Sequence, residues 1–431
     1  MDSSRESRIQ TALDSPAKRA LFLTMCLLPI VLYLAVATSQ FLAAELSAGA
    51  SLARLQWAVR LDPWNDQYRA RLGEYYLSSL QPATAVPFLN KALDMNPRQS
   101  RYWLDLAAAL HYLGKHDEEN GALTQALAVD PKTPGTAWEA ALAYISLAET
   151  DRALRQLRKV MESGPTLQLA ALEYCWRLTP DSDILLRDVL PREAAVTAEF
   201  LDMLVSKNDT AAEAKVWSRL AELHQPVERK YVFGYVQNLI GHDEFTQARL
   251  VWKQAADLAG LADYQPSSDN LVVNGDFRLP ILGTGFDWTY DQSADVTHAL
   301  DPSQSPSRHR SLEITFDSRG IEDAGIRQLI SVEPNTRYDF SAYSKTQDLL
   351  GAGGLRFVVE DFVSGDTWFT SDDLTSDGVW AQHKKQFTTG PDTQLVVLRI
   401  QRSPAGDAIR GKLWIDDVRL TLQPPLPEVR Q

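Results

Sequence analysis

The sequence predicts a multidomain α plus β chain with an N-terminal transmembrane helix, an α-helical solenoid and a C-terminal antiparallel β-sandwich. Three observations lead to this prediction. An uncharged apolar stretch lies near the N-terminus, prolines recur at a constant interval through the middle, and the Ala- and Leu-rich composition ends near residue 265. The predicted bounds are 1–19 for a cytoplasmic tail, 20–40 for the transmembrane helix, 41–265 for the solenoid, 266–422 for the sandwich and 423–431 for a flexible tail.

Size and charge limit the class of protein. The chain has 431 residues, 45% of them hydrophobic, which is enough for two or three domains with buried cores. Its 56 acidic residues exceed its 43 Lys and Arg residues, giving a net charge of −13 without a long basic run. Such a chain repels a phosphate backbone, so no nucleic-acid partner is expected. Cys26 and Cys175 lie in separate apolar and helical segments, which rules out a disulfide framework.

The N-terminal stretch from Ala20 to Ser39 contains no charged side chain. At about 1.5 Å per residue, a helix of this length matches a bilayer core of about 30 Å. Positive residues precede the stretch and are absent for some distance after it, which places the N-terminus in the cytoplasm and the bulk in the periplasm. These positive residues are Arg5, Arg8, Lys18 and Arg19. The sequence thus predicts a single-pass protein of the inner membrane; the alternative is a cleaved signal peptide, with Ala35-Val36-Ala37 as the cleavage pattern.

Prolines in the predicted solenoid recur every 34 residues, at Pro63, Pro97, Pro131 and Pro165. Small and large apolar residues stand at matching offsets in three units. The units contain Leu72, Gly73, Tyr76, Ala85, Leu89 and Ala92; Trp103, Leu106, Ala107, Leu110, Leu123 and Ala126; and Ala140, Ala141, Tyr144, Ala153, Leu157 and Val160. In period and offsets the segment resembles the tetratricopeptide repeat (TPR) family. The resemblance implies stacked helix hairpins that hold a protein partner in a groove.

Short β-type runs separated by Gly, Asp, Ser and Pro fill the region after residue 266. Apolar and polar residues alternate along them, as expected for half-buried strands of a sandwich. The expected strands are Leu271–Phe277, Ala294–Leu300, Ser311–Phe316, Gly325–Val332, Arg337–Lys345, Leu355–Phe362, Val379–Thr388, Gln394–Arg402 and Lys412–Leu422.

Ordered sequence elements of this region resemble those of a known family. They include the opening Leu271-Val272-Val273-Asn274-Gly275-Asp276-Phe277, then Trp288, and the closing Leu413-Trp414-Ile415-Asp416-Asp417-Val418. Together they resemble the jelly-roll carbohydrate-binding modules of xylanases and glucanases (CBM4/9 type). The resemblance implies a polysaccharide ligand, held where the apolar faces of sugar rings pack on aromatic side chains.

Candidate sugar contacts are aromatic residues in polar hairpins or on strand faces opposite the expected core, namely Tyr290, Tyr343, Trp368 and Phe369. Trp288, Trp380 and Trp414 are expected to pack in the sandwich instead. The resemblance also implies a structural Ca²⁺ ion, the one cofactor considered, with hard oxygen ligands from Asp276, Asp416 and Asp417. The chain departs from the family at Arg278, where an acidic residue is common, and Arg278 could instead pair with Asp416 or Asp417.

No catalytic motif is evident in the sequence. The histidines show no HExxH or other close metal-ligand spacing and are expected in loops or at the surface: His111, His116, His224, His242, His298, His309 and His383. Adjacent acidic residues on a strand point to opposite faces, so they do not supply the paired carboxylates of a glycoside hydrolase. A protein that is not an enzyme is therefore predicted.

These features predict a membrane-anchored, non-catalytic adaptor of the bacterial cell envelope. Its repeats would recruit a protein partner and its sandwich would bind polysaccharide, as in exopolysaccharide or surface-glycan assembly. The alternative is a pure protein scaffold of an inner-membrane complex, in which the sandwich is structural and has no affinity for sugar. Binding of a glycan separates the two hypotheses.

Overall fold

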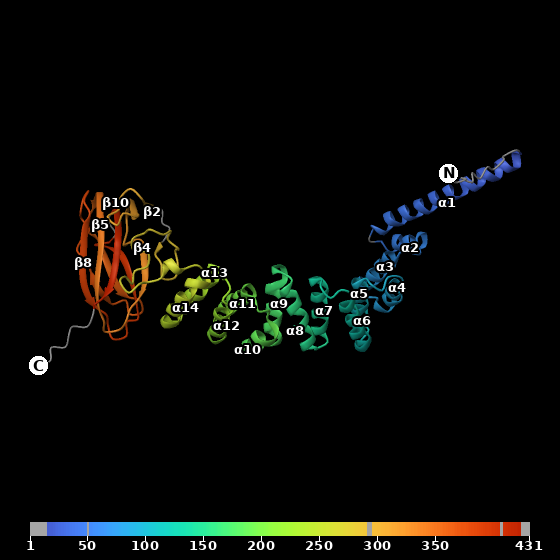
Figure 1. Ribbon diagram of the computed structural model, residues 1–431, viewed down its shortest axis with the longest axis horizontal. Helices are drawn as coiled ribbons and strands as arrows, with labels where there is room; N and C mark the ends of the chain where they lie inside the picture. Colours follow the sequence, from blue (N-terminus) through green and yellow to red (C-terminus); the bar gives the residue numbers. More distant parts are fainter. Residues whose placement is uncertain (1–14, 50, 291–294, 406–407, 424–431) are drawn as a thin grey trace, which may run out of the picture. The chain divides into compact units, whose positions relative to one another are not determined.

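A computed structural model of the chain describes residues 15–49, 51–290, 295–405 and 408–423. Its contacts divide the chain into two compact units, Met1–Val189 and Leu190–Gln431. The described residues of the first unit form helices, whereas those of the second form helices followed by strands (Figure 1). The predicted fold class, a helical solenoid and an antiparallel β-sandwich preceded by one apolar helix, is confirmed.

The first unit begins with a long apolar helix, α1 (Pro16–Ser47), of 32 residues. Its length and composition allow it to cross a membrane, although a signal sequence or the core helix of a soluble protein meets the same criteria. The helix extends beyond the predicted span of 20–40 at both ends. Near its C-terminal end Ala43 packs with Ala58 and Tyr68, and Arg71 donates a hydrogen bond to the Ser47 carbonyl at 2.8 Å. The last turn of α1 is therefore joined to the helices that follow.

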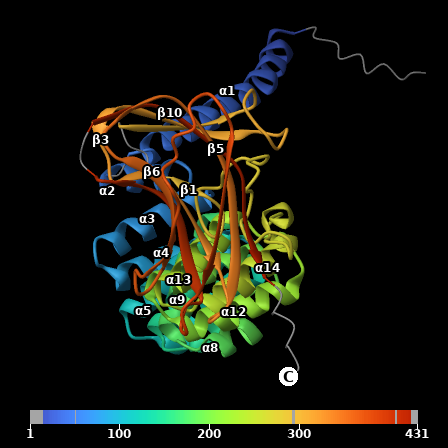
Figure 2. The same cartoon turned by 90° about the vertical axis from the view of Figure 1, so that its left-hand side faces the viewer.

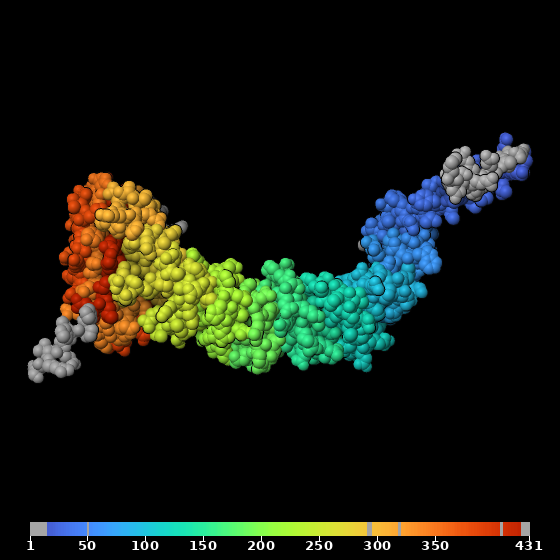
Figure 3. Space-filling model, in the orientation of Figure 1, coloured from blue at the N-terminus to red at the C-terminus, as the bar shows by residue number. Residues whose placement is uncertain are grey.

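Helix hairpins follow α1 in chain order, so the colours of the first unit change from blue to green along its surface (Figure 3). They are built from α2 (Leu52–Leu61), α3 (Asp66–Ser78), α4 (Pro82–Met95), α5 (Ser100–Tyr112), α6 (His116–Val129), α7 (Pro134–Ser146) and α8 (Thr150–Glu162). Helices α3 and α4, α5 and α6, and α7 and α8 pair, while α3, α5 and α7 contact one another in succession. A Cβ on Gly73 would lie 2.6 Å from Cγ of Leu89, so glycine permits the close approach of α3 and α4.

The proline spacing reflects how the second helix of each hairpin ends. Asp62, Asn96 and Asp130 each precede a proline and leave the helix with ψ angles of 82°, 81° and 79°. A proline ring disfavours the helical conformation of the residue before it, and proline has no N–H to continue the helix. After Pro165 the elements become shorter: η1 (Pro165–Leu167), α9 (Gln168–Leu178), α10 (Ser182–Ile184) and η2 (Leu185–Val189).

The second unit starts with four helices and continues into the sandwich. The helices are α11 (Ala194–Lys207), α12 (Thr210–Leu223), α13 (Arg229–Gly241) and α14 (Phe245–Leu258), followed by η3 (Ala262–Tyr264). The change from helix to strand thus falls between Tyr264 and Thr289, whereas the contacts divide the chain at Val189. The last helices and the sandwich therefore form one compact unit.

Two five-stranded antiparallel sheets form the sandwich. The strands are β1 (Thr289–Tyr290), β2 (Val296–Asp301), β3 (Ser311–Gly320), β4 (Asp323–Ser331), β5 (Arg337–Gly351), β6 (Gly354–Asp361), β7 (Thr367–Thr370), β8 (Ala381–Thr388), β9 (Leu395–Ser403) and β10 (Ala408–Leu422). One sheet has the order β1-β4-β9-β6-β7 and the other β2-β3-β10-β5-β8. Figure 2 shows β3, β10 and β5 of the second sheet in one layer. The core between the sheets includes Phe277, Trp288, Phe340 and Phe357.

One predicted strand is wrong. The segment 271–277 forms turns rather than a strand. A side chain holds its turn: the Gln328 amide accepts from the Val273 N–H at 3.0 Å and donates to the Val273 carbonyl at 2.8 Å. Because Gln328 satisfies both backbone groups, Val273 stays buried without a strand partner.

Helix α14 packs against the sandwich within the second unit. The indole of Trp252 lies edge-on to Phe286, with ring centroids 5.8 Å apart, and Phe245 lies edge-on to Phe362 at 5.7 Å. Gly285, with φ +65°, lies directly under Trp252, where a Cβ would overlap the indole ring. These contacts join the helices and the sandwich across the predicted boundary at 265/266.

Candidate functional sites

The sandwich has a pocket at the edge where β7 and β8 leave the space between the sheets open. Its volume is about 330 Å³. The lining residues are Phe340, Phe369, Ser371, Asp372, Gln382, His383, Lys384 and Lys385. Two phenylalanine rings from opposite sheets, Phe340 on β5 and Phe369 on β7, form the floor with centroids 4.8 Å apart. The pocket combines a small aromatic floor with a mostly polar rim.

His383 is the half-buried polar group of this pocket. Its Nε2 atom lies 2.8 Å from the Ser344 hydroxyl, and burial lowers the pKa of the imidazole despite the opposing charge of Asp372. Burial therefore favours a neutral imidazole, which carries one donor and one acceptor nitrogen. Asp372, Gln382 and the two lysines are exposed at the rim and offer further donors and acceptors.

The four predicted sugar contacts lie on different faces. Phe369 is 6% exposed and packs in the core against Phe340 and Phe387, so its ring is largely unavailable for stacking. Trp368, its neighbour on β7, is half-buried, packs against the sandwich core and lies close to Gly390. Tyr343 is half-buried on the outer face of its sheet, opposite Gln382 in register. Three of the four residues thus lie at or beside the β7–β8 edge, two of them packed on the core and Tyr343 on the outer face of its sheet.

Tyr290 lies at the opposite edge of the sandwich. It belongs to β1, is 40% exposed, and stacks on His298 of β2 with ring centroids 5.4 Å apart. Both rings line a pocket of about 260 Å³, whose other walls are mostly apolar, including Ile281 and Leu300. This edge has the most exposed of the predicted aromatic rings but fewer hydrogen-bonding side chains than the β7–β8 edge.

The three predicted calcium ligands do not form one set. Asp416 is fully buried, and its carboxylate accepts hydrogen bonds from the Ser305 hydroxyl, the Ser307 backbone and hydroxyl, and the Asp417 N–H at 2.7–3.0 Å. Burial raises the pKa of Asp416, an effect that these hydrogen bonds oppose. Protein donors thus occupy the positions that a Ca²⁺ ion would require.

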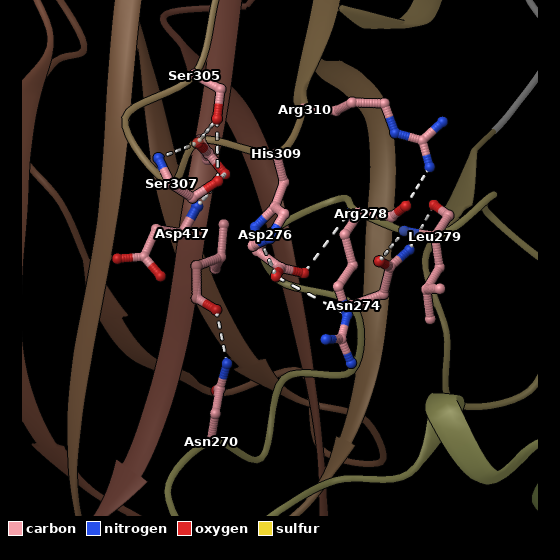
Figure 4. Close-up of polar contacts among 12 residues, drawn as sticks. Asn270, Asn274, Asp276, Arg278, Leu279, Ser305, Ser307, His309, Arg310 and Asp417 are labelled. Atoms are coloured by element: carbon pink, nitrogen blue, oxygen red, sulfur yellow. Dashed lines mark hydrogen bonds and ion pairs between the residues drawn. The ribbon is translucent and has the colours of Figure 1, made fainter. Parts of the chain in front are cut away.

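Asp276 and Asp417 line a cavity of about 310 Å³ whose lining does not include Asp416. Figure 4 shows Asp276 with His309 and Arg278 beside it. Asp276 lies 3.3 Å from Nδ1 of His309 and 4.0 Å from Nε of Arg278, and Asp417 accepts from Arg419 at 2.8 Å. Arg278 thus pairs with Asp276 of its own turn rather than with Asp416 or Asp417. Basic side chains already lie beside both carboxylates, so these residues do not fit the predicted calcium site as they are placed.

The helical array contains a further cavity, of about 210 Å³, between α5, α6 and α7. Apolar residues such as Leu104 and Ala143 line it together with His111 and Glu119. The side chains of His111, His116 and Glu119 meet here. The expectation that the histidines lack close metal-ligand spacing is therefore wrong for this pair. Helix α5 ends just after His111 and α6 begins at His116, and only the turn at Gly114 reveals that the two histidines are neighbours.

No family model matches this sequence, and no curated protein matches it. Solved structures resemble its two kinds of fold separately. A CBM4 structure is 17% identical and covers 35% of this chain and 99% of its own, with a TM-score of 0.28. The structure of MamA is 16% identical and covers 40% of this chain and 85% of its own, with a TM-score of 0.25.

A third similar structure is the first TPR of Spaghetti (RPAP3) bound to an HSP90 peptide. It is 16% identical and covers 27% of this chain and 93% of its own, with a TM-score of 0.25. The structural neighbours of this chain thus include a TPR domain and a CBM4 domain.

Proposed function

We propose that this chain is a non-catalytic, membrane-anchored adaptor of the bacterial cell envelope. Helix α1 spans the inner membrane once, the helical array recruits a protein partner, and the sandwich holds a segment of polysaccharide, as in exopolysaccharide or surface-glycan assembly. The observation that carries the sugar-binding part is the pocket at the β7–β8 edge, with its phenylalanine floor and polar rim. Of the four predicted aromatic contacts, we retain Trp368 and Tyr343 as flanking residues of this pocket.

The chemistry of the pocket suits a sugar. A pyranose ring presents C–H groups that pack on aromatic carbon and hydroxyl groups that need hydrogen-bond partners. The parts of Phe340 and Phe369 that line the pocket offer a small apolar contact, while Asp372, Gln382 and the neutral His383 supply acceptors and donors around it. The pocket lies at an open edge, so a chain of sugars can enter with one residue and continue beyond the rim.

The helical array supports protein recruitment. Helices α3, α5 and α7, the first helices of successive hairpins, contact one another in a row. Such a row commonly holds an extended peptide or a partner helix. Tyr112 on α5 is 62% exposed beside the cavity between α5 and α7, which offers an aromatic contact to a bound segment.

The sugar-binding proposal is tested by titrating the full chain, in detergent, with a panel of neutral and uronic-acid polysaccharides. The full chain is needed because Trp252 and Phe245 of α14 pack on the sandwich. We expect the rim variants Asp372→Ala and Gln382→Ala each to weaken binding about 3- to 10-fold, the effect of one or two lost hydrogen bonds. Tyr290→Ala, at the opposite edge, is the matched control and should bind normally.

Loss of binding in Tyr290→Ala with normal binding in both rim variants would move the site to the β1–β2 edge. If no glycan binds the wild-type chain, the scaffold alternative holds. That alternative has its own supporting observation, because α14 is fixed to the sandwich through Trp252 and Phe286. A sandwich fixed in this way could serve as a structural end of the helical array within an inner-membrane complex.

A further inference from the structure

Three metal-binding side chains meet in the helical array. His111 lies in the last turn of α5, His116 begins α6, and Glu119 follows one turn later. Nδ1 of His111 lies 3.2 Å from each oxygen of the Glu119 carboxylate, and Nδ1 of His116 lies 3.2 Å from Oε2. The ligand atoms of all three residues lie within 4.8 Å of one another.

The hairpin turn sets this geometry. Gly114 has φ +68°, and backbone hydrogen bonds from Gly114 to the His111 carbonyl (2.9 Å) and from Lys115 to the Leu110 carbonyl (3.0 Å) close the turn. Helix α6 then runs back beside α5. Residues three apart on a helix share a face, so His116 and Glu119 both point toward His111.

Glu119 is the buried member of the group. It is 1% exposed, whereas the side chains of His111 and His116 are 37% and 58% exposed. A buried carboxylate is costly unless hydrogen bonds and opposite charge compensate it. Among the described residues, the hydrogen bonds to its side chain come from these two imidazoles. A divalent cation at the same place would bring two positive charges to the carboxylate.

We propose that His111, His116 and Glu119 bind a divalent transition-metal ion of the Zn²⁺ class. In a tetrahedral site with Zn–N and Zn–O bonds of about 2.0–2.2 Å, neighbouring ligand atoms lie about 3.3–3.6 Å apart. The observed N···O distances of 3.2 Å need only a small expansion to reach this spacing. Two imidazoles with one carboxylate favour Zn²⁺, Ni²⁺ or Cu²⁺ over Mg²⁺ and Ca²⁺, which prefer oxygen ligands alone.

The ion would keep one coordination position open. Three protein ligands leave the fourth position of a tetrahedral ion to water or another donor. His111 and Glu119 line the cavity of about 210 Å³ between α5, α6 and α7, which has room for that ligand. This site is independent of the proposed sugar-binding pocket, since the two share no residue.

The test uses the full chain without a polyhistidine tag, in detergent, after treatment with a chelator. Titration calorimetry with Zn²⁺ should show one equivalent bound with micromolar or tighter affinity, unaffected by excess Ca²⁺. Residues that only hydrogen-bond to a metal ligand typically change metal affinity 10- to 100-fold when they are substituted. His116→Ala removes a ligand itself, so it should weaken Zn²⁺ binding at least about 100-fold. Glu119→Gln should weaken it as well, because it removes the anionic ligand.

His224→Ala is the matched control, since His224 is an exposed histidine bonded to the Glu222 carbonyl. Its Zn²⁺ affinity should equal that of the wild type. The exposed position of His116 makes its truncation compatible with folding, which the helical circular dichroism signal checks. The proposal would be overturned if the wild type bound no equivalent of Zn²⁺. It would also be overturned if His116→Ala and the double variant His111→Ala/His116→Ala kept the wild-type Zn²⁺ affinity. In either case the histidines would serve only as hydrogen-bond donors to a buried acid.

Discussion

The helical array and the β-sandwich bring chain segments together over different sequence distances. In the array, Gly73 contacts Leu89 within a single hairpin, and the contact is with a side chain. In the sandwich, Gly275 before the first strand contacts Val418 in the last strand, and the contact is with backbone. A hairpin can adjust to a local change, because each repeat contacts only its neighbours. The sandwich has less freedom, since its strands depend on one another across the whole domain.

The two regions also bury an acid in different ways. Asp105 in α5 lies 2.9 Å from Arg101, whereas the side chain of Asp287 accepts from the backbone N–H of Leu282 at 2.7 Å. Burial raises the pKa of each to about 7. The short ion pair of Asp105 would by itself lower its pKa, but Arg101 is 51% exposed and its charge is screened by water, so burial prevails. The nearby Glu74 also raises the pKa of Asp105, whereas hydrogen bonds from the Leu282 and Trp288 backbone and the Asn274 side chain lower that of Asp287. In both regions burial outweighs the groups that favour the charged carboxylate.

The largest expected effect comes from adding one methyl group in each region. In Gly275→Ala the new Cβ would overlap the Val418 carbonyl oxygen, and moving the backbone would break the 2.9 Å hydrogen bond from the Val418 N–H to the Gly275 carbonyl. We expect a loss of about 3 kcal/mol or more from the second unit. In Gly73→Ala, overpacking against Leu89 costs about 1–3 kcal/mol, but the gain in helix propensity of about 1 kcal/mol offsets part of it.

Hydrogen exchange measured by mass spectrometry gives the change in stability of each unit separately. Gly121→Ala is the control, because Gly121 lies in α6 and a Cβ at this position would meet no described neighbour within 4 Å. This variant should stabilise the array by up to about 1 kcal/mol through its helix propensity. If Gly275→Ala and Gly73→Ala lowered the free energy of unfolding of their units equally, a glycine packed on backbone would be no less replaceable than one packed on a side chain, and the comparison would fail.

A smaller effect is expected from the buried acids. Their folded-state pKa values, about 7, lie above that of an unfolded Asp, so the folded chain holds more protons between about pH 4 and pH 7. Stability therefore falls as the pH rises through this window. Asp287→Asn removes that loss and should stabilise the second unit at pH 8 by roughly 1–3 kcal/mol relative to the wild type, with little difference at pH 4.

Asp105→Asn should gain less at pH 8, because the neutral side chain loses its ion pair with Arg101. The measurement is the denaturation midpoint of each variant between pH 4 and pH 8, followed by hydrogen exchange in each unit. A difference between Asp287→Asn and the wild type that does not change with pH would show that Asp287 does not titrate in this range.

Periodicity in the sequence was sufficient to predict both folds. The 34-residue spacing follows from the way each proline ends a helix, which is a local effect, and alternation along the strands places residues such as Tyr338 and Phe340 in the core. It was not sufficient at segment 271–277, which contains apolar residues but pairs with no strand, because Gln328, far along the chain, bonds the backbone of Val273. Long-range side-chain contacts of this kind leave no periodic signal.

The candidate sites were less predictable for a related reason. Sequence alternation places Trp368 and Phe369 on opposite faces of a strand, but only the paired sheets show that Phe369 points inward. His111 and Glu119 lie on different helices, and their contact depends on the turn between them. Prediction of that turn at Gly114, with His116 as the first residue of the next helix, would have brought the three residues together before the structure was known.

The smallest expected effect concerns the ion pair between α14 and the sandwich. Arg249 lies 3.1 Å from Glu333, but the two side chains are 51% and 61% exposed. Exposed pairs contribute about 0–1 kcal/mol, because water screens the charges and both side chains lose freedom. A double-mutant cycle of Arg249→Ala and Glu333→Ala should give a coupling energy below about 1 kcal/mol that decreases with added salt. A coupling well above 1 kcal/mol that still decreases with added salt would show that charge, rather than the aromatic contacts of Trp252 and Phe245, holds the helices to the sandwich.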